Sequence, residues 1–262
     1  YVKQLFKKKR INLKNFKYVA SIEKAVKKAD FIQECATENY SIKTQLMHVI
    51  SKYAKPNAII SSSSSGLLPT KIYSKCKNPA RGMIGHPFNP VYMCPGVEIV
   101  PGKKTKKIFL NKANNFYKSI SMNPIMVKKE LPGYLADRLQ EALWRESLHI
   151  INEGYASTKD LDRAIEDGPG LRWSLMGTFL TFHLAGGEAG MKHMLKQFGP
   201  ALKLPWTKLK APKLSKKLSS KIILGTKQQA QGKLVSTLSN IRDEYLLNLL
   251  KMRKKYENKI RK

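Results

Sequence analysis

Apolar positions in the first half of the chain recur with two different periods. Short runs rich in Ile, Val and Phe predict β-strands at residues 30–36, 57–64, 81–88, 96–102 and 123–130. Between the first two runs, and again before the last, apolar residues at helical spacing predict helices over residues 39–54 and 103–120. Strands that alternate with helices form parallel sheets with crossover connections, so this part of the chain is predicted to be α/β.

From about residue 132 onward, apolar positions recur with the period of a helix. An apolar stripe predicts a helix over residues 134–154 that ends at Gly154, and the same period returns over 235–260. Ser157 and Asp160 have the spacing of a capping box, which predicts a helix that ends at Gly168. We therefore expect a sheet-containing domain over residues 1–131 and an all-helical domain over 132–262, with the boundary near Pro132.

The composition is that of a globular protein. Of the 262 residues, 42% are hydrophobic, which is enough for a sizeable core. Three cysteines without a CxxC pair argue against a disulfide framework and favour a reducing, cytoplasmic location. No apolar run approaches the roughly 20 residues of a membrane helix, so we expect no membrane partner.

The charge is strongly positive, because 49 Lys and Arg face 18 Asp and Glu, for a net charge of +31. Such a balance can indicate a nucleic-acid partner. However, the lysines are spread through nearly every segment, with concentrations in the first eighteen residues and from Lys203 onward. No zinc-ligand spacing and no aromatic–basic signature accompanies them. We expect neither a metal site nor a dedicated nucleic-acid site, and a polyanion-binding protein remains the alternative.

Two sequence features could carry chemistry at strand ends. The serines at 61–65 directly follow the apolar run "NAII", and hydroxyls at the carboxyl end of a parallel strand lie where open α/β sheets bind ligands. A polar linker is the other interpretation. His86 ends the next predicted strand, and its neighbours Gly85 and Pro87 predict a sharp local backbone.

Glu98 lies in the apolar run "GVEIV", where an unpaired carboxylate would be costly, so it should have a partner. If the partner is His86, the two form an oriented general base, in which the carboxylate fixes the ring tautomer and stabilises the imidazolium. A purely structural histidine is the alternative.

Three long motifs resemble a known family. "SSSSSGL", "GHPFNPVYMCPGVEIV" and "PGYLADRLQEALWRE" are similar to the 3-hydroxyacyl-CoA dehydrogenase superfamily, and residues 166–202 most resemble its L-carnitine dehydrogenase branch. The resemblance implies an incomplete Rossmann-type domain followed by a helical domain that forms a homodimer. It also implies NAD as the cofactor and a small 3-hydroxy acid as the substrate.

The resemblance assigns roles to individual residues. The family's catalytic histidine and its glutamate partner fall on His86 and Glu98. The serine that contacts both cofactor and substrate falls on Ser65, and the remaining cofactor contacts fall on Glu38, Lys43 and Asn89.

The chain departs from the family pattern in the cofactor fingerprint. No three glycines have GxGxxG spacing, and the chain begins with Tyr1. Either a preceding segment is missing, or dinucleotide binding has been lost. As given, the chain is expected to bind NAD weakly or not at all, because the phosphate-binding turn is absent.

The second departure is Asp137, a further catalytic candidate, where the family usually has asparagine beside the reacting oxygen. An amide can donate a hydrogen bond to a carbonyl, whereas an ionised carboxylate only accepts. Asp137 could orient a substrate hydroxyl, but it would disfavour the ketone and a nearby substrate carboxylate.

The predicted function is NAD-dependent oxidation of the 3-hydroxyl of L-carnitine to 3-dehydrocarnitine. The alternatives within enzymes are another 3-hydroxy acid dehydrogenase of the gulonate dehydrogenase and lambda-crystallin branch, and a 3-hydroxyacyl-CoA enzyme. A degenerate, structural relative and a polyanion-binding protein are the non-catalytic alternatives.

Overall fold

The computed structural model describes residues 15–174, 177–208, 210, 213, 215–231 and 233–260. It divides into two compact units, of which one runs to Asp137 and the other begins at Arg138. Most of the lysine-rich start of the chain lies outside the described residues. We describe each unit by itself below.

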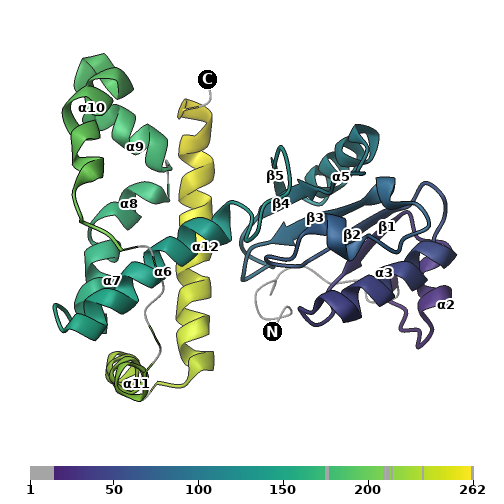
Figure 1. Ribbon diagram of the computed structural model, residues 1–262, viewed down its shortest axis with the longest axis horizontal. Helices are drawn as coiled ribbons and strands as arrows, with labels where there is room; N and C mark the ends of the chain where they lie inside the picture. The colour runs from purple at the N-terminus through teal and green to yellow at the C-terminus, as the bar shows by residue number, and fades with distance from the viewer. Residues whose placement is uncertain are drawn as a thin grey trace. The chain divides into compact units, whose positions relative to one another are not determined.

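The first unit is built on a five-stranded sheet in the order β1-β2-β3-β4-β5 (Figure 1). The strands are β1 Phe31–Glu34, β2 Ile59–Ser62, β3 Gly82–Pro87, β4 Gly96–Pro101 and β5 Asn123–Met126. Each falls inside one of the five runs that the sequence predicts and is shorter than that run.

Three of the four strand pairs are parallel, as expected, but β3 and β4 are antiparallel. The expectation of a wholly parallel sheet is therefore wrong for this pair. The physical reason is the connection at residues 88–95, which contains no crossover helix and so returns the chain in the opposite direction. The antiparallel register places His86 directly opposite Glu98.

Helices cover both faces of the sheet (Figure 1). Helix α3, Tyr40–Tyr53, packs on one face together with α2, Ile22–Val26, and α4, Pro69–Ile72. Helix α5, Lys107–Ser119, packs on the other face. Because side chains alternate along a strand, Ile60 joins the core beneath α3 while its neighbour Ile59 joins the core beneath α5.

The second unit is helical. Its helices are α6 Ala136–Glu153, whose first residues belong to the first unit, α7 Thr158–Glu166, α8 Pro169–Trp173, α9 Thr178–Ala185, α10 Gly190–Phe198, α11 Lys216–Ala230 and α12 Val235–Ile260. The capping box of Ser157 and Asp160 is present at the start of α7, as predicted. The predicted α/β sheet domain followed by a helical domain is confirmed.

None of the described helices is long and apolar enough to cross a membrane. Among the described residues, His, Cys, Asp and Glu side chains also form no group of three or more that could hold a metal ion.

Candidate active site

His86 and Glu98 face each other across the antiparallel pair of β3 and β4. His86 Nδ1 lies 3.0 Å from Glu98 Oε2, and the two residues are only 6% and 0% exposed. The chain returns from β3 to β4 between them, so their spacing of twelve positions follows from the strand register. The expected contact between the imidazole and the buried carboxylate is therefore present.

The second oxygen of Glu98 accepts two backbone hydrogen bonds. The N–H of Leu135 donates to Oε1 at 2.9 Å and the N–H of Ala136 at 3.0 Å, where α6 begins. Burial alone would raise the pKa of Glu98, but the hydrogen bonds from His86, Ala136 and Leu135 together lower it below its usual value. Glu98 is thus an ionised carboxylate at neutral pH.

The negative charge of Glu98 determines which nitrogen of the His86 imidazole carries the proton. An ionised carboxylate can only accept a hydrogen bond, so the ring nitrogen that faces it, Nδ1, carries the proton. In the neutral ring the lone pair then lies on Nε2, on the side away from Glu98. This is the tautomer that a general base needs, since Nε2 can accept a proton while Glu98 stabilises the resulting cation.

Two aromatic rings hold the imidazole in place. Phe88 meets the ring edge-on and Tyr134 is tilted against it, both with centroids 5.6 Å away. Tyr134 is fully buried and its hydroxyl donates to the carbonyl of Leu67 at 2.6 Å. Burial raises the pKa of the Tyr134 hydroxyl far above its usual value, so it remains a hydrogen-bond donor.

The predicted sharp backbone around His86 is wrong, because β3 is extended from Gly82 through Pro87. Gly85 is required for space instead. A Cβ there would lie 1.9 Å from the Tyr117 hydroxyl and 2.4 Å from the Ser61 Oγ. The glycine next to the histidine therefore allows helix α5 to approach the sheet closely.

A polar network, which the sequence did not predict, lies beside this glycine. The Tyr117 hydroxyl donates to Gln33 Oε1 at 2.6 Å, and Gln33 Nε2 donates to the carbonyl of Gly85 at 3.0 Å. Burial raises the pKa of Tyr117 to about 12, so it stays protonated. The network supports the strand immediately before His86, and no local sequence pattern signals it, since its members are far apart in the chain.

Asp137 lies on the other side of the imidazole. Its Oδ2 is 3.8 Å from His86 Nε2, and its side chain is 35% exposed. This distance is too long for a hydrogen bond but suits an ion pair when the ring is protonated. The structure therefore brings together three of the predicted catalytic residues, with the imidazole between two carboxylates.

Ser65 and Glu38 lie beyond the carboxyl ends of β2 and β1. Glu38 Oε1 accepts the hydroxyl of Ser64 at 2.5 Å and the N–H groups of Ser65 and Gly66 at 3.0 and 3.3 Å. These bonds fold the serine-rich segment into a defined loop. The Ser65 hydroxyl is exposed and makes no hydrogen bond within the described residues, so it can reach a ligand.

Lys43 is placed differently from a direct cofactor ligand. It is 1% exposed, and its Nζ donates to both oxygens of buried Glu34 at 3.0 and 3.2 Å and to the carbonyl of Ala36 at 2.8 Å. It also lies 3.6 Å from Glu38 Oε2. This geometry favours an indirect role, in which Lys43 holds Glu38 and the end of β1; its contact with NAD stays a prediction.

The strand-end groups suit the nicotinamide half of a dinucleotide. Ser65 offers a hydroxyl, exposed Asn89 offers an amide, and Glu38 offers a partly exposed carboxylate, which are the donors and acceptors that a ribose and a carboxamide need. Ser65 and Asn89 follow neighbouring strands, β2 and β3, beyond the same edge of the sheet. These residues therefore fit the cofactor that the resemblance implies.

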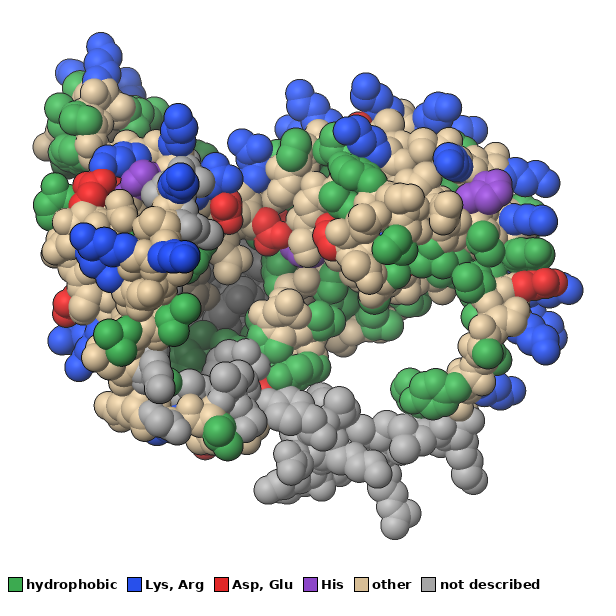
Figure 2. All heavy atoms as spheres, turned by 60° about the horizontal axis from the view of Figure 1, so that its bottom comes forward, with side chains coloured by type: hydrophobic (Ala, Val, Ile, Leu, Met, Phe, Trp, Pro, Cys, Tyr) green, Lys and Arg blue, Asp and Glu red, His purple; other side chains and the backbone are tan. Residues whose placement is uncertain are grey.

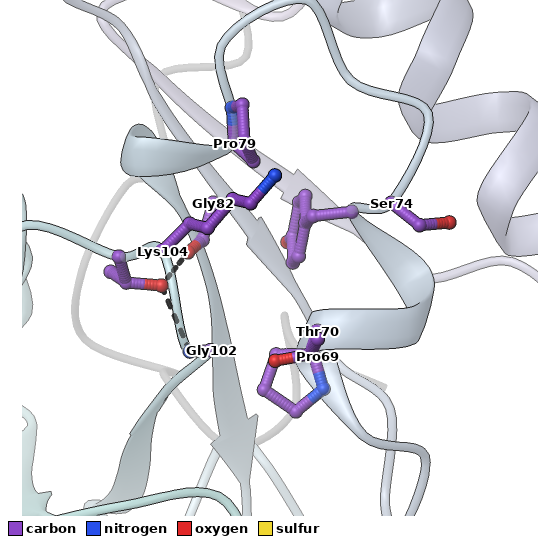
Figure 3. A pocket seen from close by; sticks show the side chains of 9 residues that line it. Pro69, Thr70, Ser74, Pro79, Gly82, Gly102 and Lys104 are labelled. Atoms are coloured by element: carbon purple, nitrogen blue, oxygen red, sulfur yellow. Dashed lines mark hydrogen bonds between the residues drawn. The ribbon is translucent and has the colours of Figure 1, made fainter.

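Two cavities lie at the opposite end of β3 from His86. One of about 160 Å³ is lined by Pro69, Thr70, Tyr73, Gly82 and Lys104 among others. Figure 3 shows Pro69, Thr70 and Lys104 around it. It is too small for a dinucleotide. The other, of about 720 Å³, is lined by four lysines, Lys103, Lys107, Lys128 and Lys129. Neither cavity contains a predicted site residue.

Two family models match the chain in succession. Residues 2–131 match the NAD binding domain of 3-hydroxyacyl-CoA dehydrogenase, and residues 133–232 match its C-terminal domain. Together with the sheet and its strand-end histidine, these matches define an NAD-dependent dehydrogenase of the 3-hydroxyacyl-CoA dehydrogenase class.

Curated relatives narrow this class. The chain is 53% identical over 234 residues to an L-carnitine dehydrogenase of Pseudomonas putida, which covers 89% of this chain and 73% of that protein. It is 48% identical over 255 residues to an L-carnitine dehydrogenase of Oceanobacillus iheyensis, which covers 97% of this chain and 83% of that protein. The chain belongs to the L-carnitine dehydrogenase family.

Solved structures agree on the fold. FHMPC 5-dehydrogenase, described as an NAD+-dependent dismutase, superposes with a TM-score of 0.71 at 23% identity, over 91% of this chain and 77% of that one. An (S)-3-hydroxybutyryl-CoA dehydrogenase from Ralstonia eutropha gives a TM-score of 0.59 at 25% identity, over 76% of this chain and 72% of that one. At this level of identity we take these structures as evidence for the fold.

Proposed function

We propose that the protein oxidises the 3-hydroxyl of L-carnitine to 3-dehydrocarnitine, with His86 as the general base. The observation that carries the chemistry is the buried contact between His86 Nδ1 and Glu98 Oε2 at 3.0 Å, which leaves Nε2 to accept a proton. The names of the relatives that share about half of its sequence support the substrate.

The proposed reaction divides into a proton and a hydride. His86 Nε2 accepts the proton of the substrate hydroxyl, and Glu98 stabilises the imidazolium that forms. As the oxygen loses its proton, the carbon–hydrogen bond at the same carbon breaks and a ketone forms. NAD, when bound, supplies the acceptor for that hydride. Ser65, Asn89 and Glu38 would hold the nicotinamide ribose and carboxamide beside the substrate.

The substrate is tested by measuring NADH formation by the full-length protein with L-carnitine, L-gulonate and (S)-3-hydroxybutyryl-CoA. We expect the highest kcat/KM with L-carnitine. Turnover of the acyl-CoA or of gulonate without turnover of L-carnitine would contradict the proposed substrate and would favour one of the other branches of the superfamily.

We also propose that the protein acts as a homodimer in the cytoplasm. Helix α9 supports the dimer, because Phe179, Phe182 and Leu184 are 85%, 45% and 58% exposed. Apolar side chains gathered on one short helix are typical of an interface. The free thiols of Cys35, Cys76 and Cys94 support a reducing compartment. Sedimentation of the full-length protein tests the oligomeric state.

Polyanion binding is a second candidate function, and one observation favours it. The cavity of about 720 Å³ is lined by Lys103, Lys107, Lys128 and Lys129, none of which has an ion-pair partner among the described residues. We place it second because Lys and Arg side chains are scattered widely over the face that Figure 2 shows. Binding to DNA that persists at about 0.15 M salt with a steep salt slope would support it, and loss of binding there would remove it.

A further inference from the structure

Asp137 places a negative charge next to the nitrogen that the substrate hydroxyl must reach. Its Oδ2 lies 3.8 Å from His86 Nε2, and more than a third of its side chain is accessible to solvent. The buried Glu98 already serves the other nitrogen of the ring. Asp137 is therefore not needed to set the tautomer of His86, and its position beside Nε2 brings it close to any substrate hydroxyl that binds there.

For a 3-hydroxy acid without a cationic group, the negative charge of Asp137 is unfavourable to the reaction. A carboxylate cannot donate a hydrogen bond to the ketone product, and it repels the carboxylate of a 3-hydroxy acid. A neutral amide of the same shape would avoid both costs. A substrate that brings a cationic group to this position would offset both costs.

We propose that Asp137 is the counter-ion that selects a substrate with a quaternary ammonium group on the carbon next to the reacting carbon. This inference rests on the proposed function and deepens it by assigning a specificity-determining residue. In such a substrate the cationic nitrogen is three bonds from the hydroxyl oxygen. When that oxygen is at a hydrogen-bond distance of about 2.8 Å from Nε2, the cationic group can reach within a few ångströms of Oδ2.

Asp137 also orients the substrate. The reacting carbon carries two arms, one ending in the cation and the other in the carboxylate. Attraction of the first arm and repulsion of the second both turn the cationic arm towards Asp137. With the hydroxyl held at His86 and the carbon-bound hydrogen directed at the nicotinamide, a fixed position for the cationic arm defines one enantiomer. The carboxylate thus contributes to the handedness of the substrate as well as to its charge.

The test is a comparison of two substrates that differ only in charge. The kcat/KM of the full-length enzyme is measured with L-carnitine and with 3-hydroxy-5,5-dimethylhexanoate of the same configuration, in which carbon replaces the cationic nitrogen. We expect Asp137→Asn to lower the ratio of the two values by roughly 10- to 100-fold, mainly by raising KM for L-carnitine. The ratio is independent of how much of each preparation is folded, so a purely structural role of Asp137 would leave it unchanged.

Asp30→Asn is the matched control. Asp30 immediately precedes β1, at the opposite end of that strand from the site, and its exposed carboxylate pairs with Lys55 at 2.7 Å. This variant removes the same charge and should leave the ratio within about twofold of wild type. An unchanged ratio in Asp137→Asn, with wild-type enzyme active on L-carnitine, overturns the counter-ion role and leaves the proposed function standing. Wild-type enzyme inactive on L-carnitine overturns the proposed function, and the counter-ion role with it.

Discussion

The sheet unit has a well-buried core, whereas three helices of the helical unit bury none of their residues. In the sheet unit, Ile60 and Met83 from the two faces are 1% and 0% exposed, and the buried carboxylates Glu34 and Glu98 are paired with Lys43 and His86. In the helical unit, α7, α8 and α9 contain no buried residue, and Phe179 is 85% exposed. The sheet unit therefore has a closed apolar core with paired carboxylates, whereas these three helices of the helical unit present apolar surface that suits association.

This comparison explains why the candidate catalytic residues lie where they do. A general base needs fixed geometry and a partner of fixed charge, which only a closely packed element provides. His86 and Glu98 lie on paired strands, and the network through Gln33 and Tyr117 supports the preceding glycine. We expect substitutions in the sheet unit to change chemistry and stability strongly, and substitutions on α9 to change association.

The largest effect is expected at His86. His86→Ala removes the proton acceptor and should lower kcat by about 10²- to 10⁴-fold with little change in the circular dichroism spectrum. His48→Ala is the control, because His48 Nδ1 contacts only the carbonyl of Lys75 on the surface of the same unit. Turnover that survives in His86→Ala would remove this residue as the base.

Lys43 should show the largest effect on stability. Lys43→Met leaves buried Glu34 without its cationic partner, and breaking a buried ion pair costs about 3–5 kcal/mol. Urea denaturation at neutral pH measures the loss. Lys52→Met, at an exposed position of the same helix, should change the free energy of unfolding by less than about 0.5 kcal/mol. Similar stability of the two variants would mean that the pair is not a main support of the strand end.

Glu98 should make the stability of the sheet unit depend on pH. Because the pKa of Glu98 in the folded state is below the ordinary value of 4.5, its stabilisation is fully present above that value. It is lost as the pH falls through the folded-state pKa. Glu98→Gln should therefore lower the free energy of unfolding by about 1–3 kcal/mol at pH 7. The difference in free energy of unfolding between this variant and wild type should become smaller towards pH 3.

Urea denaturation at several pH values measures the difference in free energy of unfolding between Glu98→Gln and wild type. Glu23→Gln is the control, since Glu23 is an exposed residue of α2 and its variant should follow the wild-type curve. A difference between Glu98→Gln and wild type that stays constant from pH 7 to pH 3 would contradict the ionised state that we assign to Glu98.

The smallest effect on stability is expected on α9. Phe179→Ser replaces an 85% exposed side chain and should change the free energy of unfolding of the monomer by no more than about 0.5 kcal/mol. It should nevertheless shift the monomer–dimer equilibrium towards monomer in analytical ultracentrifugation. Tyr155→Ser, at a 78% exposed aromatic residue between α6 and α7, serves as the control for loss of an exposed ring.

The sequence predicted the strands and the main helices because their apolar periods are set by burial on one or two faces. It also predicted that Glu98 has a partner, since an unpaired carboxylate in an apolar strand is costly, and the family resemblance assigned that partner as His86. It did not predict the antiparallel direction of β4, which depends on how the residues at 88–95 return, or the role of Gly85, which depends on the Tyr117 hydroxyl. Both are set by contacts between residues distant in the chain, which no local pattern records.

The hydrogen bonds of Glu98 also restrict where the two family domains can be separated and exchanged. The two family domains meet between residues 131 and 133, yet the carboxylate that serves His86 is held by the backbone of Leu135 and Ala136. A recombination that exchanged everything after residue 132 would keep both side chains of the pair but would replace the segment that supplies two of the hydrogen bonds to Glu98. The hydrogen-bonding of the pair thus extends past the family boundary, and a chimaera joined at residue 132 would keep it only if the new segment placed its backbone N–H groups at the same positions.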